Sequence, residues 1–338
     1  MRILLVTQMW PSAAEPDLGS FLLPLVGELR ALGHDVEVAS ISRRGGAPTK
    51  YAALAADAVR AARRQRPDVV FAHFLFPAGA AALAAARTAG APLVVMAHGT
   101  DVANLDRPPL RALTRPVIRG ATTVIANSRW LAGRLEGHYA ALRCEVCDLG
   151  VDLAQFAPGA AAPAPWSGER PRLLCVGSLI PRKNVVALAD AFAALGRGSL
   201  TFVGDGPLRP QLEGRAGVTI AGRVPHDAVA SWVAACDVLC QPSLVEPFGL
   251  ATLEAMAMER TVVATTAGGP PEFVTPQAGV LVDPGDPSAL TAALATAAQM
   301  PSPNPAARAA AAQHDVARQT RRMARILEDA IAGKRSSS

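Results

Sequence analysis

Short apolar runs alternate with longer amphipathic stretches along the first half of the chain. The run RILLVT (2–7) is followed by a polar loop and then, over 21–32, by apolar residues at helical spacing. Similar short runs predict strands at 35–41, 67–73, 91–98, 121–127 and 143–149, with helices at 51–65 and 78–89. Apolar strands that alternate with helices are typical of a parallel sheet covered on both faces.

The same pattern begins again after a stretch without periodicity. Residues 154–171 (AQFAPGAAAPAPWSGERP) are rich in Pro, Ala and Gly, which indicates a linker between domains. After it, strands are predicted at 172–178, 199–206, 217–222, 236–243 and 261–266, and helices at 184–195, 207–215, 226–235, 249–258 and 286–299.

These elements predict an α/β protein of two doubly wound, Rossmann-like domains with parallel sheets that face each other across a cleft. The N-terminal domain covers 1–153 and the C-terminal domain covers 172–305. A last amphipathic helix covers 306–332, and packing back on the N-terminal domain is one arrangement open to it.

The composition excludes several classes of protein. Of the 338 residues, 50% are hydrophobic and 18% are charged, so the chain can bury a large core and is not globally disordered. Aromatic residues make up only 4%, which disfavours a stacking platform for single-stranded nucleic acid. The net charge of +5 comes from scattered basic residues and not from a block typical of a nucleic-acid-binding tail.

The termini and cysteines indicate a cytoplasmic protein without a metal site. No apolar run reaches the roughly 18 residues of a membrane span, and the apolar start at 2–7 is too short for a signal peptide. Cys144 and Cys147 form a lone C-x-x-C with no second ligand pair, and residues three apart on a strand point to opposite faces.

Common nucleotide and hydrolase motifs are absent. The sequence has no G-x-x-x-x-G-K-[ST] phosphate loop, no G-x-S-x-G elbow and no H-E-x-x-H helix. GDGPLR (204–209) lacks the third glycine of a dinucleotide fingerprint. No Asp-x-Asp pair that could hold a metal on a diphosphate occurs either.

Chemistry-bearing residues gather where predicted strands end, which is where open parallel sheets bind ligands. The richest segment is 243–274, in which Glu246 precedes a helix that opens at Phe248-Gly249-Leu250 and Glu254 lies well inside that helix. The free amides of a helix start are a natural seat for a phosphate. Taken alone, the two carboxylates would more often be a solvated helix start and a surface charge.

Several motifs in order resemble one family. EPFGLATLEAMA followed by GGPPE, VGSLIPRKN (176–184), VGDGP (203–207), LGVDLAQF (149–156) and the opening MWPSAAEPDLGSF are similar to retaining nucleotide-sugar glycosyltransferases of family 4, which have the GT-B fold. The resemblance spans about residues 3–330.

The resemblance implies a role for each matching residue. Glu246 would contact the transferred sugar near the reaction centre, and His98 would lie at the donor sugar, which makes these two the catalytic candidates. Glu254 would hold the ribose hydroxyls, and Lys183 would neutralise the diphosphate. The implied donor-binding residues are Gly19, Ser178, Arg182, Lys183, Gly204, Asp205, Phe248, Gly249, Leu250 and Glu254.

The sequence departs from the family pattern at three places. Ser178 stands where many members have Arg, so Lys183 would carry more of the diphosphate contact. Asn184 replaces a common Gly, and Ser20 replaces the second Gly of the first loop.

Other strand-end residues could contact the acceptor. Asp101 and Asn127 are the acceptor candidates, whereas His73 is expected to pack and not to react. The arginines of the last helix leave a membrane-surface contact open, but a solvated helix face is favoured.

The resemblance implies retaining transfer of a hexose from a UDP- or GDP-linked donor to a hydroxyl of a glycan, a lipid-linked molecule or a small molecule. It implies no divalent metal and no cofactor besides the nucleotide sugar, and nothing points to a nucleic-acid partner. Two alternatives stay open, a GT-B nucleotide-sugar epimerase and a non-catalytic nucleotide-sugar-binding subunit. In the family reading, donor binding would also close the two domains.

Overall fold

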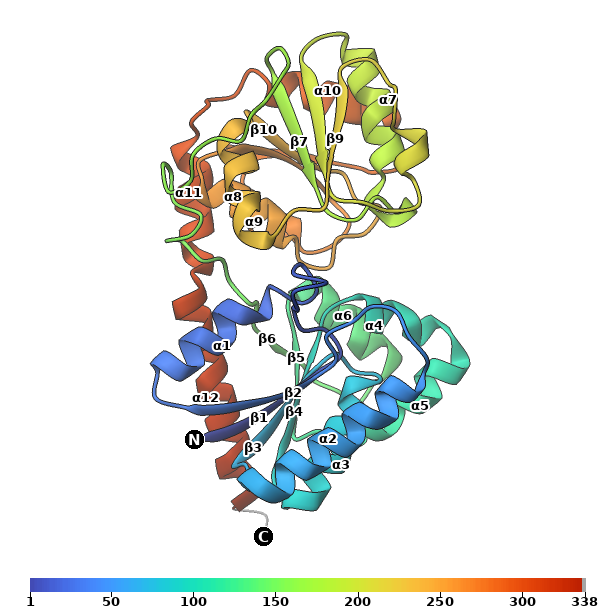
Figure 1. The fold of residues 1–338 in the computed structure, drawn as a ribbon, viewed down its shortest axis with the longest axis vertical. Helices are drawn as coiled ribbons and strands as arrows, with labels where there is room; N and C mark the ends of the chain where they lie inside the picture. The colour runs from blue at the N-terminus through green and yellow to red at the C-terminus, as the bar shows by residue number, and fades with distance from the viewer. Residues whose placement is uncertain (336–338) are drawn as a thin grey trace. The chain divides into compact units, whose positions relative to one another are not determined.

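The computed structural model describes residues 1–335 and forms two compact units (Figure 1). Unit 1 consists of Met1–Leu149 and the segment from Val316 onward, and unit 2 consists of Gly150–Asp315. The chain therefore passes between the units twice. Within the described residues, no helix is both long and apolar enough to cross a bilayer.

The sheet of unit 1 has six parallel strands in the order β2-β1-β3-β4-β5-β6. The central strands are buried along their length, because helices cover both faces of the sheet. The strands are β1 (Arg2–Thr7), β2 (Asp35–Ser40), β3 (Val69–His73), β4 (Leu93–Ala97), β5 (Thr123–Ala126) and β6 (Glu145–Val146).

Two separate hydrophobic clusters fill the faces of this sheet. One contains residues of α2, α3, α5 and α6, and the other contains residues of α1 and α12. Cys144 packs against the first cluster and Cys147 lies in the second, so the C-x-x-C pair is split across the sheet as its spacing predicted. The helices are α1 (Leu22–Ala31), α2 (Thr49–Gln65), α3 (Ala78–Ala89), α4 (Thr100–Ala103), α5 (Pro108–Gly120), α6 (Arg129–His138) and α12 (Val316–Arg335).

The C-terminal region differs from the single helix predicted over 306–332. It forms α11 (Pro305–Ala311), a 3₁₀ turn (Ala312–His314) and then α12, because Asp315 takes an extended conformation with ψ 131°. Helix α12 packs on α1 and buries Met323 and Leu327 there.

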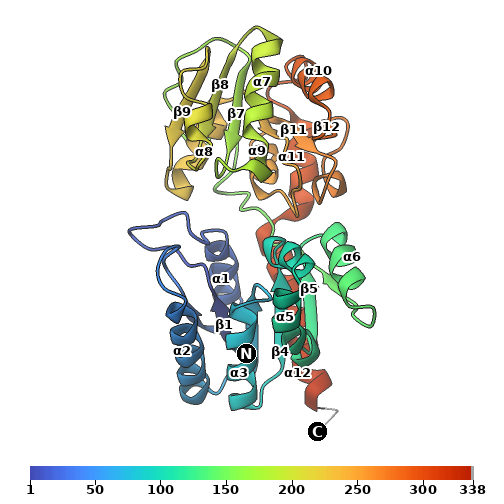
Figure 2. The same cartoon turned by 90° about the vertical axis from the view of Figure 1, so that its right-hand side faces the viewer.

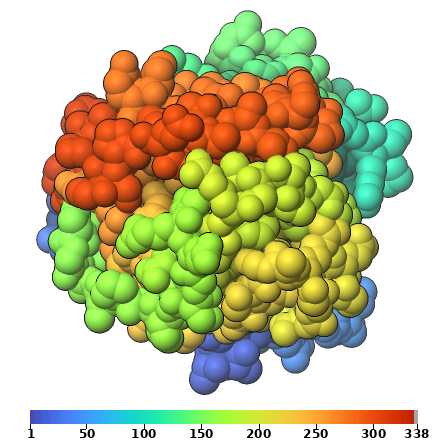
Figure 3. Space-filling model, turned by 90° about the horizontal axis from the view of Figure 1, so that it is seen from above, coloured from blue at the N-terminus to red at the C-terminus, as the bar shows by residue number. Residues whose placement is uncertain are grey.

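Unit 2 repeats the architecture with the strand order β12-β11-β10-β7-β8-β9, again all parallel (Figure 2). Helices α7 and α10 pack together on it, and the space-filling view in Figure 3 shows its yellow-green and orange-red segments side by side. The strands are β7 (Arg172–Val176), β8 (Ser199–Val203), β9 (Val218–Gly222), β10 (Val238–Gln241), β11 (Thr261–Thr265) and β12 (Gly279–Val282). The other helices are α7 (Val185–Leu195), α8 (His226–Ala235), α9 (Leu250–Ala257) and α10 (Pro287–Ala297).

Residues 154–171, predicted as a linker, carry no helix or strand and pack on unit 2. The indole of Trp166 donates a hydrogen bond to Ser199 Oγ at 2.8 Å and its ring lies 6.1 Å from that of Trp232. The helix predicted over 207–215 is only a 3₁₀ turn (Arg209–Gln211), because Pro210 interrupts it and Gly214 follows.

Candidate active site

Four loops of unit 2 follow the carboxyl ends of neighbouring strands. Strand β7 pairs with β8 on one side and with β10 on the other, and β10 pairs with β11. The loops after these strands therefore meet at one edge of the sheet. They contain the VGSLIPRKN, VGDGP, SLVEPFG and AGGPPE segments, so the fold brings these motifs together as predicted.

Lys183 and Glu246 form the central ion pair of this edge. Lys183 Nζ lies 2.6 Å from Glu246 Oε2, and the Ser243 hydroxyl donates to the same oxygen at 3.0 Å. The two side chains are only 17% and 11% exposed, so the pair is largely withdrawn from water. The interpretation of Glu246 as a solvated helix-start charge is therefore wrong.

The surroundings keep Glu246 ionised. Burial opposes its charge, but the Lys183 ammonium, the Arg182 guanidinium and the Ser243 hydroxyl outweigh burial and lower the pKa of Glu246 below its ordinary value. A carboxylate and an ammonium thus face each other at neutral pH.

Arg182 supports the neighbouring loop with both its main chain and its side chain. Its guanidinium donates to the Val245 carbonyl at 3.0 Å, and its own carbonyl accepts a hydrogen bond from the amide of Leu244 at 2.8 Å. Ser178, by contrast, is exposed.

Glycines allow these loops to approach one another closely. Gly204 has φ +146°, and a Cβ there would lie 1.9 Å from the Gly177 carbonyl oxygen. Gly268 has φ +136°, and a Cβ there would lie 1.9 Å from the Glu246 carbonyl oxygen. No side chain fits at either position, so the backbone of Glu246 is held directly against the loop after β11.

Asn184 shows why one departure from the family pattern is tolerated. It has φ +55°, the left-handed region that favours Gly, and Asn is among the few other residues that adopt it readily. Its side-chain amide also donates to the Pro284 carbonyl at 3.1 Å.

Helix α9 begins at this edge, as predicted. Gly249 caps it with φ +105° and no side-chain cap, and Leu250 is its first residue. The buried Phe248 precedes the cap and lies 5.6 Å from the ring of Phe273. The uncapped amides of the first turn, with the positive end of the helix dipole, suit an anion.

Glu254 lies inside α9 and has a partner that the sequence did not predict. His226 Nε2 lies 3.0 Å from Glu254 Oε1, and the Glu254 side chain is only 5% exposed. Burial works against a charged imidazole, but the hydrogen bond and charge of Glu254 outweigh it and raise the pKa of His226. Glu254 is therefore not a surface charge. Because His226 follows the loop after β9, the strand-end rule could have found it.

Asp205 is less enclosed than the other candidates. Its Oδ1 accepts the amide of Gly206 at 2.7 Å, its Oδ2 lies 3.7 Å from the Arg209 guanidinium, and its side chain is 40% exposed. The carboxylate shapes the turn after β8 and stays open to solvent.

His98 and His73 form a pair at the strand ends of unit 1. His73 Nδ1 lies 3.0 Å from His98 Nε2, and the rings of Phe74 and Phe21 lie 4.4 and 5.4 Å from His98. Burial lowers the pKa of His73 well below its ordinary value, and the charge that His98 would carry when protonated lowers it further. Burial also lowers the pKa of His98 to about 4, although the charge of Asp101 opposes this.

Both rings are therefore neutral at pH 7, and a single proton lies between the facing nitrogens. The prediction that His73 only packs missed this contact. His73 Nε2 is buried and has no hydrogen-bond partner among the described residues, so His73 can hold His98 but is sealed from solvent.

Asp101 organises the backbone around His98. Its carboxylate accepts the amides of Gly99 at 2.8 Å, Leu75 at 3.0 Å, and Val102 and His98 at 3.1 Å each. With these bonds, and 5% exposure, Asp101 positions the start of α4; an acceptor contact by its carboxylate stays a prediction.

The other two candidates of unit 1 differ in how they are held. Gly19 has φ +70°, and a Cβ there would lie 2.4 Å from the Met9 carbonyl oxygen, so its loop requires glycine. Asn127 is 5% exposed, and its Oδ1 has no partner among residues 1–335. Its acceptor role is likewise untested.

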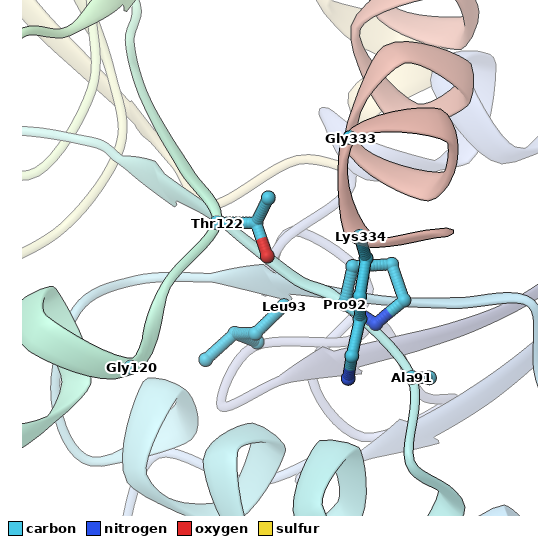
Figure 4. Close-up of a pocket in the computed structure, with 7 residues that line it drawn as sticks. All are labelled: Ala91, Pro92, Leu93, Gly120, Thr122, Gly333 and Lys334. Carbon is cyan, nitrogen blue, oxygen red and sulfur yellow. The ribbon is translucent and has the colours of Figure 1, made fainter. Parts of the chain in front are cut away.

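A pocket of about 320 Å³ lies elsewhere in unit 1 (Figure 4). It is lined by Ala91, Pro92, Leu93, Gly120, Thr122, Gly333 and Lys334. The pocket lies at the amino ends of β4 and β5, the opposite edge of the sheet from His98, and the end of α5 and the last residues of α12 complete its lining. The pocket contains none of the predicted site residues.

Comparison with known proteins identifies both halves of the chain. "Glycosyltransferase Family 4" matches residues 18–155 and "Glycosyl transferases group 1" matches residues 170–299. A putative teichuronic acid biosynthesis glycosyltransferase of Bacillus subtilis is 27% identical, over 87% of this chain and 88% of the relative.

A GDP-mannose-dependent alpha-(1-6)-phosphatidylinositol monomannoside mannosyltransferase of Mycobacterium tuberculosis is 32% identical, over 59% of this chain and 58% of the relative. The chain thus spans less than two thirds of that relative. Anabaena HepE in complex with UDP-glucose has a similar fold, with a TM-score of 0.75 at 23% identity, covering 97% of this chain and 100% of that one. The expected fold and family are confirmed: this chain belongs to the family 4-like GT-B glycosyltransferases.

Proposed function

We propose that this enzyme transfers a hexose from a nucleotide diphosphate sugar to an acceptor hydroxyl, with retention of configuration and without a divalent metal. The observation that carries the proposal is the buried Lys183–Glu246 pair next to the glycine-capped start of α9. Together these features offer a cation and an anion-binding helix end to one ligand.

The leaving diphosphate defines the task of the cations. As the bond between the sugar C1 and the phosphate oxygen breaks, negative charge builds on that oxygen. The Lys183 ammonium and the amides of Gly249 and Leu250 would stabilise this charge, with Arg182 adding to the local positive potential. These fixed groups supply the charge stabilisation for which other enzymes use a metal.

Retention follows if the acceptor approaches on the face that the diphosphate leaves. The acceptor oxygen bonds to C1 while the C1–phosphate bond breaks, and the acceptor proton passes to the leaving phosphate oxygen. Glu246, held ionised by its neighbours, would stabilise the cationic sugar and accept its hydroxyls. No protein nucleophile is required.

Two further groups would orient the donor. Glu254 has its Oε1 engaged by His226, which leaves Oε2 to accept a ribose hydroxyl. His98 is neutral at pH 7 and has its Nε2 engaged by His73, which leaves Nδ1 for a sugar hydroxyl.

The relatives suggest which donors to test first. One solved neighbour binds UDP-glucose and one relative is named GDP-mannose-dependent, so uridine and guanosine donors are both candidates. The acceptor would be a glycan, lipid-linked or small-molecule hydroxyl. All five cysteines are free thiols, which suits a reducing, cytoplasmic compartment.

A donor screen followed by product analysis tests the proposal. The right nucleotide sugar should raise the thermal midpoint. With that donor, we expect product with the donor's anomeric configuration by proton NMR, at equal rates with and without EDTA. An inverted product, or loss of activity in EDTA that Mg²⁺ restores, would refute the mechanism. Epimerised donor without acceptor would indicate the epimerase instead.

A further inference from the structure

His73 is a fully buried polar side chain that takes no direct part in the proposed reaction. It ends β3, has no exposed surface, and its ring lies 4.4 Å from the ring of Phe71. Its side chain makes one hydrogen bond among residues 1–335, which joins Nδ1 to Nε2 of His98 at 3.0 Å. Burying an imidazole away from water costs free energy. The contact with His98 is therefore the one property that a phenylalanine at this position would not provide.

The contact admits two arrangements of protons. Burial lowers the pKa of both rings, so both are neutral at pH 7, and a neutral imidazole has one N–H and one bare nitrogen. If His98 Nε2 carries the shared proton, the proton of His73 lies on its Nε2 and His98 Nδ1 is bare. If His73 Nδ1 carries the shared proton, His73 Nε2 is bare and the proton of His98 lies on Nδ1.

The surroundings of His73 favour the second arrangement. His73 Nε2 is sealed and has no partner in the part of the chain that the structure describes. In the first arrangement it would be a buried N–H without an acceptor, and such orphaned donors are rarer in proteins than under-satisfied acceptors. The second arrangement leaves only a bare nitrogen at this position.

Asp101 favours the same arrangement from the other side of His98. Its carboxylate accepts the backbone amide of His98 at 3.1 Å. Covalent geometry places Nδ1 of a histidine nearer the backbone than Nε2, so a negative charge held at the backbone stabilises a proton on Nδ1 more than one on Nε2. His98 is half-buried and its Nδ1 is not among the sealed atoms of residues 1–335, so an N–H at this nitrogen is open to a ligand.

We propose that His73 is a positioning residue that holds His98 in the Nδ1–H tautomer, so that His98 donates a hydrogen bond from Nδ1 to an oxygen of the transferred sugar. The hydrogen bond at one ring nitrogen decides which tautomer the other nitrogen presents. The donated bond rests on the proposed function, whereas the tautomer does not. With a pKa of about 4, His98 is a weak base, which suits a hydrogen-bond donor and not a general base.

NMR of the full-length protein, labelled with ¹⁵N at histidine, tests the tautomer without any substrate. Protonated and bare imidazole nitrogens differ in their ¹⁵N shifts, and the signals lost in His98→Gln and His73→Phe assign the two rings. We expect a protonated Nδ1 and a bare Nε2 on His98 at pH 7. His73→Phe should move His98 towards a mixture of both tautomers.

Two further variants make the NMR test specific. His73→Asn should keep the Nδ1–H tautomer of His98, because its side-chain amide offers an N–H where His73 offers Nδ1. Phe71→Leu is the matched control, since it loosens the packing on His73 without removing the contact between the nitrogens, and it should leave the tautomer unchanged. The wild-type spectrum decides the tautomer even if His73→Phe is unstable.

Donor kinetics test the hydrogen bond to the sugar. His73→Phe should lower kcat/KM for the donor about tenfold, the contribution of one good hydrogen bond, whereas His73→Asn and Phe71→Leu should stay within about threefold of the wild type. In a His98→Ala background, His73→Phe should have no further effect. A merely structural role of His73 would instead lower activity in both backgrounds.

Three results would overturn the tautomer or the role of His73. They are a protonated Nε2 on wild-type His98, a tautomer that does not respond to His73→Phe, and a further loss of activity from His73→Phe in the His98→Ala background. Unchanged donor kinetics in His98→Ala would refute the bond to the sugar and leave the tautomer standing. Product configuration tests retaining transfer separately, so failure of the proposed function is distinguishable from failure of this inference.

Discussion

Replacing Lys183 by Ala should leave the Glu246 carboxylate buried without its main counter-charge. Breaking a buried ion pair on one side costs more than the pair contributes, because the remaining charge keeps its desolvation penalty. The Ser243 hydroxyl and Arg182 remain near Glu246, so we expect the lower end of the usual range, about 3 kcal/mol in the free energy of unfolding at pH 7.

The loss should depend on pH in a defined direction. In the wild type the pKa of Glu246 is lowered, so its stabilising contribution is present above the ordinary pKa of 4.5 and is lost as pH falls through the folded value. In Lys183→Ala, burial is opposed less and the pKa of Glu246 should rise. The carboxyl then takes up a proton at a higher pH than in the wild type, and the difference in stability between the variant and the wild type should shrink as pH falls.

Denaturant titrations of the wild type and variants at pH 7 and pH 4.5 measure this difference. Lys183→Ala/Glu246→Gln should recover most of the lost stability at pH 7, because no unpaired charge remains. Arg209→Ala is the matched control, since Arg209 pairs with Glu213 on the surface and its removal should leave stability nearly unchanged at both pH values. Equal destabilisation at both pH values, or a double variant as unstable as the single one, would refute the reasoning.

Four other predictions concern single residues. Gly204→Ala should destabilise unit 2 by about 2 kcal/mol or more, because a Cβ there would clash with the Gly177 carbonyl oxygen. Gly214→Ala, at φ +75° but in open space, should destabilise it clearly less. Similar denaturation midpoints for the two variants would show that the close approach at Gly204 does not decide the loss of stability. Glu254→Gln should weaken nucleotide binding in calorimetry with a modest effect on turnover, and the reverse pattern would mean that its role belongs to Glu246. Because the pKa of His226 is raised, its stabilising contribution is full below pH 6.5 and should be lost as pH rises through the folded value, a dependence that His226→Gln should abolish. NMR of His98 should show no titration between pH 6 and 8, and a charged ring at pH 6 would contradict its burial.

The sequence predicts the two sheets well because nearly every strand is a short uninterrupted apolar run. Strand β12 was missed, since its apolar segment VLV is only three residues long. It follows Gly279, where a Cβ would lie 2.2 Å from the Val262 carbonyl oxygen of β11. Helices α5 and α6 were missed as well, because prolines and arginines obscure the apolar spacing of α5.

The motifs predicted which residues meet at the edge of unit 2, but not how they pair. Lys183 and Glu246 are far apart in sequence, and only the neighbouring positions of β7 and β10 bring them into contact. The same holds for His226 with Glu254, where one partner lies outside every motif. Pairing of this kind depends on tertiary packing, which local periodicity does not encode.

The return of α12 to unit 1 has a consequence for synthesis on the ribosome. A nascent chain that has reached Asp315 contains every strand of both sheets and all of unit 2, yet the face of the first sheet beside α1 still lacks Met323 and Leu327. The residues of unit 2 are therefore all synthesised before α12, whereas unit 1 keeps an open apolar face until α12 has emerged and docked. Truncations before Val316, or fusions that hinder docking of α12, should consequently yield chains that depend on chaperones and aggregate through unit 1.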